Sequence, residues 1–148
     1  MPQSTLDDCI FCKIVRHDAP SIVVYEDQNT LGFLDHIPLN PGHTLVIPKK
    51  HYETMREMPA GEVGEVFVSV SKVMRGVFNA MKADGINIGQ SNGAAASQDV
   101  FHMHVHVIPR HVGDSPLGQT FPGRKRPSKE EMKKIGTLIR DSVAREHS

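Results

Sequence analysis

The clearest alternation of apolar and polar positions lies near the middle of the second half of the chain. It reads Phe101-His102-Met103-His104-Val105-His106-Val107-Ile108-Pro109-Arg110. A period of two is typical of a β-strand, in which successive side chains point to opposite faces of the sheet. The pattern therefore predicts a strand over 101–110 that has three imidazoles on one face and apolar side chains on the other.

Four further stretches have the composition of short strands and are bounded by turn residues. They cover residues 21–27, 30–35, 43–48 and 86–90. Asp27-Gln28-Asn29 separates the first two, and Asn40-Pro41-Gly42 precedes the third, as expected for tight connections between antiparallel strands. These stretches predict an antiparallel meander.

Two longer segments repeat apolar residues at helical spacing. The first, residues 59–82, carries a stripe formed by Val63, Val66, Phe67, Val70, Val73, Met74, Val77 and Met81. The second begins at the capping-box sequence Ser128-Lys129-Glu130-Glu131 and continues with Met132, Ile135, Leu138 and Ile139. A short helical turn after a cap at Asp8 precedes the first strand. The predicted fold is α+β: about five antiparallel strands, a long helix packed on one face and a C-terminal helix.

Length and charge narrow the class of protein. The chain has 148 residues, the usual size of one domain, so we expect a single domain over 1–148. Its 17 basic and 17 acidic residues balance, which disfavours nucleic acid or a membrane surface as partner and favours a small ligand. The start of the chain has no secretory pattern, so we expect a cytoplasmic protein. Arg124-Lys125-Arg126 is interpreted as part of a solvated loop.

The two cysteines, Cys9 and Cys12, lie on one side of the predicted first helical turn. A reducing compartment favours a metal or redox role over a disulfide, and no strand precedes the pair as a thioredoxin-like unit would require. Half of a tetrahedral zinc site is the preferred interpretation, and two small buried side chains are the alternative. His51 is either a third ligand or an ordinary surface histidine.

Residues 91–99 form a loop of small and polar side chains just before the histidine stretch. Its N–H groups, together with Asn92, Ser97 and Gln98, could hold phosphate oxygens, although it lacks the ending of a P-loop. An ordinary tight connection is the alternative. Asp35 ends a strand beside a turn, where its carboxylate either accepts hydrogen bonds from a ribose or caps the loop.

Three uses of the histidine face are chemically plausible. The imidazoles could bind a metal, attack a phosphate or decorate a solvated strand. Decoration is the weakest interpretation because the opposite face is apolar.

Taken together, these stretches resemble the histidine triad (HIT) family of nucleotide hydrolases and transferases. The matching pieces, in the family's order, are Phe33-Leu34-Asp35, Gly42-His43-Thr44-Leu45-Val46-Ile47-Pro48-Lys49, Asn92-Gly93, Ser97-Gln98 and the histidine stretch itself. The likeness covers about residues 9–111 and leaves 112–148 as a C-terminal segment. The Cys9-x-x-Cys12 start resembles the bacterial-type branch with structural zinc, which implies Cys9, Cys12, His51 and His102 as ligands.

The resemblance also implies a reaction. His104, with His106 and His102 in the triad, would attack the α-phosphate of a purine nucleotide conjugate, either an adenosine phosphoramidate or a dinucleoside polyphosphate, and form a nucleotidyl-histidine. A backbone carbonyl is expected to accept from Nδ1 of His104. His106 would donate to phosphate oxygens. The implied substrate contacts are Phe33 with the base, Asp35 with the ribose, His43 as orienting neighbour, and Asn92, Ser97, Gln98 and the Val100 N–H around the phosphate.

Two features of the chain limit how the family's residue roles apply to it. The family's hydroxyl residue before the triad is here Asp99, whose carboxylate would repel a phosphate unless it points elsewhere. His102 cannot serve both zinc and substrate, and we assign it to zinc, where four protein ligands would make the role structural.

The resemblance suggests a homodimer. Two other functions remain open: a metalloenzyme or metal-binding module in which His102, His104 and His106 are the ligands, and a non-catalytic nucleotide-binding module.

Overall fold

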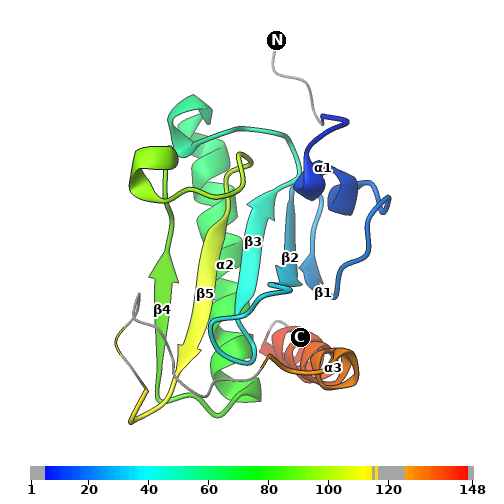
Figure 1. Ribbon diagram of the computed structural model, residues 1–148, viewed down its shortest axis with the longest axis vertical. Coiled ribbons are helices and arrows are strands. Elements are labelled where there is room, and N and C mark those ends of the chain that lie inside the picture. Colours follow the sequence, from blue (N-terminus) through cyan, green and yellow to red (C-terminus); the bar gives the residue numbers. More distant parts are fainter. Residues whose placement is uncertain (1–5, 115, 117–125, 147–148) are drawn as a thin grey trace.

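The computed structural model describes residues 6–114, 116 and 126–146. One antiparallel sheet runs through it, formed by β1 (Val23–Glu26), β2 (Thr30–Leu34), β3 (Thr44–Pro48), β4 (Gly85–Gly89) and β5 (Val105–Arg110) in the order β1-β2-β3-β5-β4 (Figure 1). Three α-helices accompany the sheet: α1 (Ile10–Val15), α2 (Ala60–Ala80) and α3 (Lys129–Glu146). Two 3₁₀ turns, η1 (Met55–Glu57) and η2 (Ala94–Ala96), lie in the connections. The predicted α+β fold of about five antiparallel strands is confirmed.

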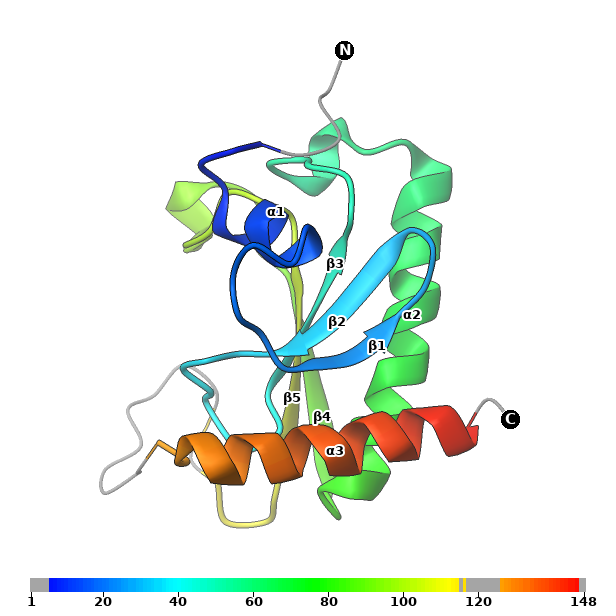
Figure 2. The same cartoon turned by 90° about the vertical axis from the view of Figure 1, so that its right-hand side faces the viewer.

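The sheet separates two apolar clusters. Every residue of β2 and β3 is buried, because helices cover both faces of these central strands. One face packs against α2 and includes Val46, Val105 and Val107. The other face packs against α1, with Phe11 meeting Phe33. Figure 2 shows α1 and α2 on opposite sides of the sheet.

Strand register places the histidine stretch on the α1 face. Phe33 pairs with Leu45, and Leu45 pairs with His106. Residues directly opposite each other in an antiparallel pair share a face, so the His106 side chain lies on the same face as the Phe33 ring. The site is thus on the face of the sheet that the long helix leaves uncovered.

The histidine stretch departs from the predicted strand at its start. β5 begins at Val105, and Phe101 is 46% exposed rather than buried. Residues 101–104 have left the strand ladder: the Met103 N–H donates to the Tyr52 carbonyl at 2.7 Å, in the connection that follows β3. Only the second half of the stretch is therefore a regular strand.

The helices follow their predicted patterns with three corrections. The cap of α1 is Cys9, whose Sγ accepts from the Cys12 N–H at 3.4 Å, and not Asp8. Phe67 in α2 and Leu138 in α3 are 36% and 53% exposed, because each apolar stripe is wider than the surface that its neighbours cover. The Ser128 capping box is confirmed, since the Glu131 N–H donates to Ser128 Oγ at 3.1 Å.

α3 closes the edge of the sheet at β1. Figure 2 shows it crossing the C-terminal end of α2. Its Arg140 guanidinium donates to the Val23 carbonyl through Nε at 3.0 Å and Nη2 at 2.6 Å, which satisfies an acceptor on the edge strand.

Some of the sequence-based interpretations lie outside the described residues. They concern the first residues of the chain and most of the loop that contains Arg124 and Lys125. Within the described part, no helix is long and apolar enough to cross a membrane.

The close contact of α2 with α3 gives a stability prediction. A Cβ added at Gly76 would overlap the Val143 side chain and lie 2.9 Å from its backbone nitrogen, whereas a Cβ at Gly64 of the same helix meets nothing within 4 Å. Gly76→Ala should lower the free energy of unfolding by about 1–3 kcal/mol through overpacking. Gly64→Ala should leave it unchanged or raise it by up to about 1 kcal/mol. Urea unfolding of both variants measures the difference, and equal effects would contradict the packing shown here.

Candidate active site and metal centre

A hydrogen bond to the backbone sets the tautomer of His104. Its Nδ1 lies 2.8 Å from the backbone carbonyl of His102. Because a carbonyl only accepts, the proton of the neutral ring resides on Nδ1, and Nε2 keeps its lone pair. The Phe11 ring packs edge-on at 5.3 Å and helps to hold the imidazole, which is 5% exposed. The expected backbone acceptor is present, and the arrangement suits a nucleophile.

A chain of hydrogen bonds sets the tautomer of His106. The Leu39 N–H donates to His43 Nδ1 at 3.0 Å, so the proton of neutral His43 is on Nε2. That Nε2 lies 2.9 Å from His106 Nδ1, which must then accept, and the proton of His106 is placed on its own Nε2. Burial, and next the neighbouring His104, lower the pKa of His106 and keep it neutral near pH 7. His43 therefore sets the tautomer of His106, and its role in orienting the triad for a substrate stays a prediction.

Asp35 and Phe33 are both largely enclosed by the protein. Asp35 Oδ1 accepts from the Ile37 N–H at 2.9 Å, and Oδ2 lies 3.6 Å from His43 Nε2. The Asp35 carboxylate thus caps its loop and also approaches the histidine chain, with 17% of the side chain exposed. The Phe33 ring is 3% exposed and packs on Phe11.

The loop before the triad is held by its own amides. Gln98 is 5% exposed; its Oε1 accepts from the Gly93 N–H at 2.7 Å, and its Nε2 donates to the Glu53 and Val100 carbonyls. Asn92 Oδ1 accepts from the Met55 N–H at 2.8 Å. These internal hydrogen bonds fix the shape of the loop, and the expected contacts of both amides with a phosphate stay predictions.

Backbone conformation explains the small residues of this loop. Gly93 has φ 102° and ψ 154°, a region that favours glycine. Ser97 is left-handed at φ 71° and exposed, with its N–H donating to the Ala94 carbonyl. Ser97, one of the predicted phosphate contacts, is therefore accessible to solvent.

Asp99 lies directly in front of His104. Its Oδ1 accepts from the Val100 N–H at 2.9 Å and lies 3.4 Å from His104 Nε2. The Val100 N–H predicted to face a phosphate is thus already bonded to a carboxylate. The Asp99 side chain is 77% exposed, so rotation can free both groups.

Cys9, Cys12, His51 and His102 converge on one point beside the triad. One potential ligand atom from each residue lies within 4.8 Å of the others. His102 Nδ1 is 3.5 Å from both sulfur atoms, and His51 Nδ1 is 3.4 Å from Cys12 Sγ. The four residues named as zinc ligands by the family resemblance therefore lie together.

The chemistry of this Cys/His cluster fits a metal ion. His102 Nε2 lies 2.8 Å from the Pro48 carbonyl, so the ring proton is on Nε2 and the Nδ1 lone pair faces the thiols. Burial raises the pKa of Cys12 to about 11 and lowers that of His102 to about 4, which leaves both groups neutral without a cation. Two sulfur and two nitrogen donors are a tetrahedral zinc set.

His102 therefore has two structural functions and no open face. Its side chain is fully buried and faces the thiols, while its carbonyl holds His104. A catalytic contact between its imidazole and a substrate, one of the expectations above, does not fit this burial.

The three triad histidines do not converge on a metal. Within residues 6–114, 116 and 126–146 the metal-competent groups are the Cys/His cluster and the set Asp35, His43 and His106. In the second set, His43 Nε2 carries a proton because Leu39 occupies Nδ1, so it cannot ligate. This argues against the metalloenzyme alternative.

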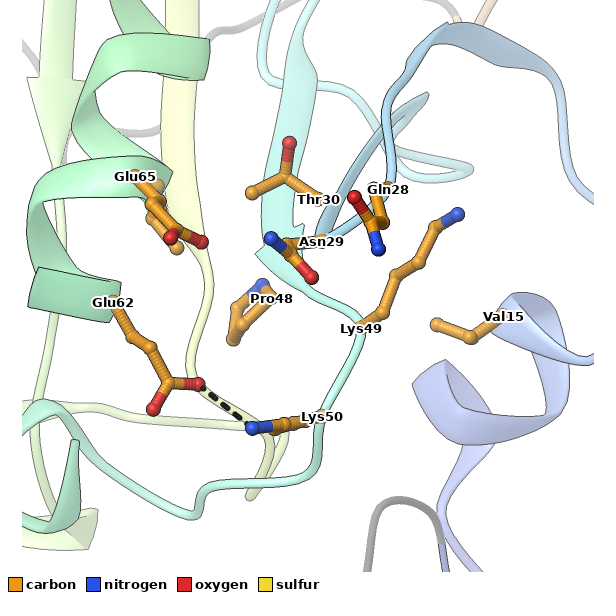
Figure 3. A pocket seen from close by; sticks show the side chains of 10 residues that line it. Val15, Gln28, Asn29, Thr30, Pro48, Lys49, Lys50, Glu62 and Glu65 are labelled. Carbon is orange, nitrogen blue, oxygen red and sulfur yellow. Dashed lines mark ion pairs between the residues drawn. The ribbon is translucent and has the colours of Figure 1, made fainter. Parts of the chain in front are cut away.

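A cavity of about 220 Å³ lies between the β1–β2 turn, the residues that follow β3 and the first turns of α2. Figure 3 shows Lys50 reaching Glu62 across it, at 3.5 Å. Lys49 is paired with Glu26 at 2.7 Å. Among the described residues that line the cavity there is no histidine, and Glu62 and Glu65 make it a poor place for a phosphate.

Comparison with known proteins agrees with this geometry. Residues 16–113 match the HIT domain family. The chain belongs to the HIT family. Among the relatives of this HIT protein, the uncharacterized HIT-like protein MJ0866 of Methanocaldococcus jannaschii is 50% identical over 109 residues, covering 74% of this chain and 84% of that one.

Two relatives have activities in their names. Adenylylsulfatase HINT3 of Arabidopsis thaliana is 44% identical over 112 residues, which cover 75% of this chain and 57% of that protein. Adenosine 5'-monophosphoramidase hnt1 of Schizosaccharomyces pombe is 37% identical over 135 residues, covering 91% and 98%.

Among the solved structures that share the fold are two histidine triad proteins. The hypothetical histidine triad nucleotide-binding protein ST2152 of Sulfolobus tokodaii has a TM-score of 0.83 and 38% identity, covering 93% of both chains. A Zn-bound histidine triad family protein of Mycobacterium smegmatis has a TM-score of 0.81 and 39% identity, covering 93% of this chain and 94% of that one.

The buried neutral histidines predict the pH dependence of stability in the metal-free protein. The pKa of His102 falls from 6.5 to about 4 on folding, so the unfolded chain takes up the proton first. The free energy of unfolding should therefore decrease as pH falls from about 6.5 to 4, by up to about 3 kcal/mol for this group. His51 and His106 shift in the same direction.

Urea unfolding at pH 7 and pH 5, with a chelator present, measures this effect. His102→Asn should flatten the dependence, and His36→Asn, whose side chain is 89% exposed, should not. Equal stability of the parent protein at both pH values would contradict the prediction.

Proposed function

We propose that this HIT protein is a nucleotide phosphohydrolase or nucleotidyl transferase that attacks the α-phosphate of purine nucleotide conjugates through His104. The observation that carries the proposal is the 2.8 Å contact between His104 Nδ1 and the His102 carbonyl, which leaves Nε2 unprotonated. The names of two relatives support it, since both describe the cleavage of an adenylyl compound, one a sulfate and the other a phosphoramidate.

In the first half-reaction the Nε2 lone pair of His104 forms a bond to the α-phosphorus. The bond to the leaving group breaks and its electron pair departs with that group. An amine leaving group takes a proton from water before it departs. His106, with its Nε2 proton set by His43, donates to phosphate oxygens as negative charge builds.

In the second half-reaction a water oxygen forms a bond to phosphorus and the P–Nε2 bond breaks. Its electron pair returns to His104, and the water gives one proton to solvent. The products are a nucleoside monophosphate and the original neutral imidazole. One difficult displacement is thereby divided into two easier ones.

Substrate positions follow from the neighbours of His104. Asp35 would accept from the ribose hydroxyls, and the base would lie against Phe33, whose ring packs on Phe11. The Ser97 hydroxyl and the Val100 N–H would reach phosphate oxygens once Asp99 has turned away. Asn92 and Gln98 would act indirectly by holding the loop.

We further propose that Cys9, Cys12, His51 and His102 hold a structural zinc ion of the bacterial type. The Zn-bound structural relative and the donor set support this. A zinc ion would tie α1 to the residues before β5. Its four ligands would all come from the protein, so it would stabilise the fold rather than activate water.

We retain the homodimer as a proposal. β4 is an edge strand of the sheet, and its Ile88 side chain is 42% exposed. Phe67 and Phe78 of α2 also expose part of their rings. Such an edge with apolar side chains is suited to pairing with a second copy.

The nucleophile is tested by trapping. After acid quench, mass spectrometry of the protein incubated with an adenosine phosphoramidate should find an adenylyl group on His104. His104→Ala should lose the adduct and lower kcat/KM by about 1000-fold or more, in the range expected when a covalent catalyst is removed.

His17→Asn serves as the matched control, because this exposed histidine lies outside the triad and asparagine tolerates its positive φ. A parent protein that never forms the adduct, or a His104→Ala variant with undiminished turnover, would leave only a nucleotide-binding module.

The zinc proposal is tested by elemental analysis and thermal unfolding. We expect one zinc per chain, lost in Cys12→Ser. Chelation should lower the unfolding temperature, while the protein that stays folded still forms the His104 adduct. Complete loss of turnover in folded, zinc-free protein would instead favour the metalloenzyme.

A further inference from the structure

Asp99 combines two contacts that a substrate phosphate would also need. Its Oδ1 occupies the Val100 N–H at 2.9 Å and faces His104 Nε2 at 3.4 Å. An N–H donor and a nucleophilic nitrogen are the groups that a reacting phosphoryl group must meet. The carboxylate therefore stands where a phosphate oxygen would otherwise lie.

Substrate has to displace this carboxylate, but it cannot remove the charge from the site. The backbone of Asp99 follows directly on Gln98, which is buried and whose side chain is held by three hydrogen bonds. In the part of the chain that the structure describes, Asp99 lies against the neutral imidazole of His104, and no ion pair joins it to lysine or arginine. The negative charge is therefore not neutralised by a permanent cation.

The direction of attack decides which part of the substrate meets this charge. In an in-line displacement the entering and leaving atoms lie on opposite sides of phosphorus. His104 is 5% exposed and Asp99 is 77% exposed, so the leaving group lies on the outer side of phosphorus, towards which Asp99 extends. The exposed carboxylate then lies on the same side of phosphorus as the departing group.

Leaving groups differ in charge as their bond to phosphorus breaks. A phosphoramidate nitrogen takes a proton from water before the P–N bond breaks, and it bears positive charge until the electron pair of that bond returns to it. A polyphosphate leaves as an anion and needs no proton. A fixed carboxylate attracts the protonated phosphoramidate nitrogen and repels the polyphosphate anion.

We propose that Asp99 is a specificity-determining residue, whose carboxylate favours nucleotide conjugates that release an amine and disfavours those that release a polyphosphate. This inference rests on the proposed function. At about 4 Å, two unit charges interact strongly enough to change a rate about fivefold in bulk water, and more at a partly enclosed surface. Attraction of one substrate and repulsion of the other together predict a discrimination on the order of tenfold.

The experiment compares two substrates that share the adenylyl group. They are an adenosine 5'-phosphoramidate and diadenosine tetraphosphate, assayed without added divalent cations, which would neutralise the polyphosphate. The quantity measured is the ratio of kcat/KM for the polyphosphate to kcat/KM for the phosphoramidate. Asp99→Asn, which removes the charge but keeps the shape, should raise this ratio about tenfold. Asp99→Glu, which keeps the charge, should leave it within about threefold of the parent value.

Ionic strength separates a charge effect from a change in loop shape. The parent ratio should rise as salt is increased from about 0.01 M to 1 M, because the Debye length shortens from about 30 Å to 3 Å. The ratio for Asp99→Asn should change much less. Asp141→Asn on the exposed face of α3 alters the net charge equally and should leave the ratio at the parent value.

The outcomes are distinct. If both substrates are turned over and Asp99→Asn leaves the ratio unchanged, or Asp99→Glu shifts it as much as Asp99→Asn does, the inference about Asp99 is wrong while the proposed function stands. If the parent protein turns over neither substrate and forms no adduct, the proposed function is wrong and the inference falls with it.

Discussion

The hydrogen bond between His104 Nδ1 and the His102 carbonyl is the contact on which the site depends. At 2.8 Å it fixes both the tautomer and the direction of the imidazole. It exists because residues 101–104 leave the strand ladder and are held instead by the Met103 N–H on the Tyr52 carbonyl. A regular strand would use the His102 carbonyl for pairing, and His104 would lose its acceptor. The short irregular segment before β5 is therefore what makes the ring suited to attack phosphorus.

His102 links the Cys/His cluster to His104. His102 turns its imidazole towards Cys9 and Cys12 and offers its carbonyl to His104. An ion that held this imidazole in place would also hold the backbone carbonyl of the same residue in place. The Cys/His cluster thus has a physical reason to lie beside the triad, although it has no open position for a substrate. The Cys/His cluster and the His104 ring therefore depend on the same segment of backbone.

Most of the fold was predictable from local patterns. Alternation identified the sheet, helical spacing identified α2 and α3, and the Ser128 capping box was located by its four residues. The errors were local as well: Phe67 and Leu138 fit their stripes but remain exposed, and Phe101 fits the alternation but lies outside the strand. A pattern states which side chains are apolar, whereas burial depends on what the rest of the chain places against them.

The sequence by itself determined the reactive groups, because an imidazole run, a cysteine pair and a carboxylate in front of the triad are facts of composition and order. Only the tertiary structure decided how the protons are distributed. The route from Leu39 through His43 to His106 joins segments far apart in the chain, and so does the approach of His51 to Cys12. Tautomers and ligand sets depend on which nitrogen meets a donor, and that is settled by distances of a few ångström that no linear pattern contains.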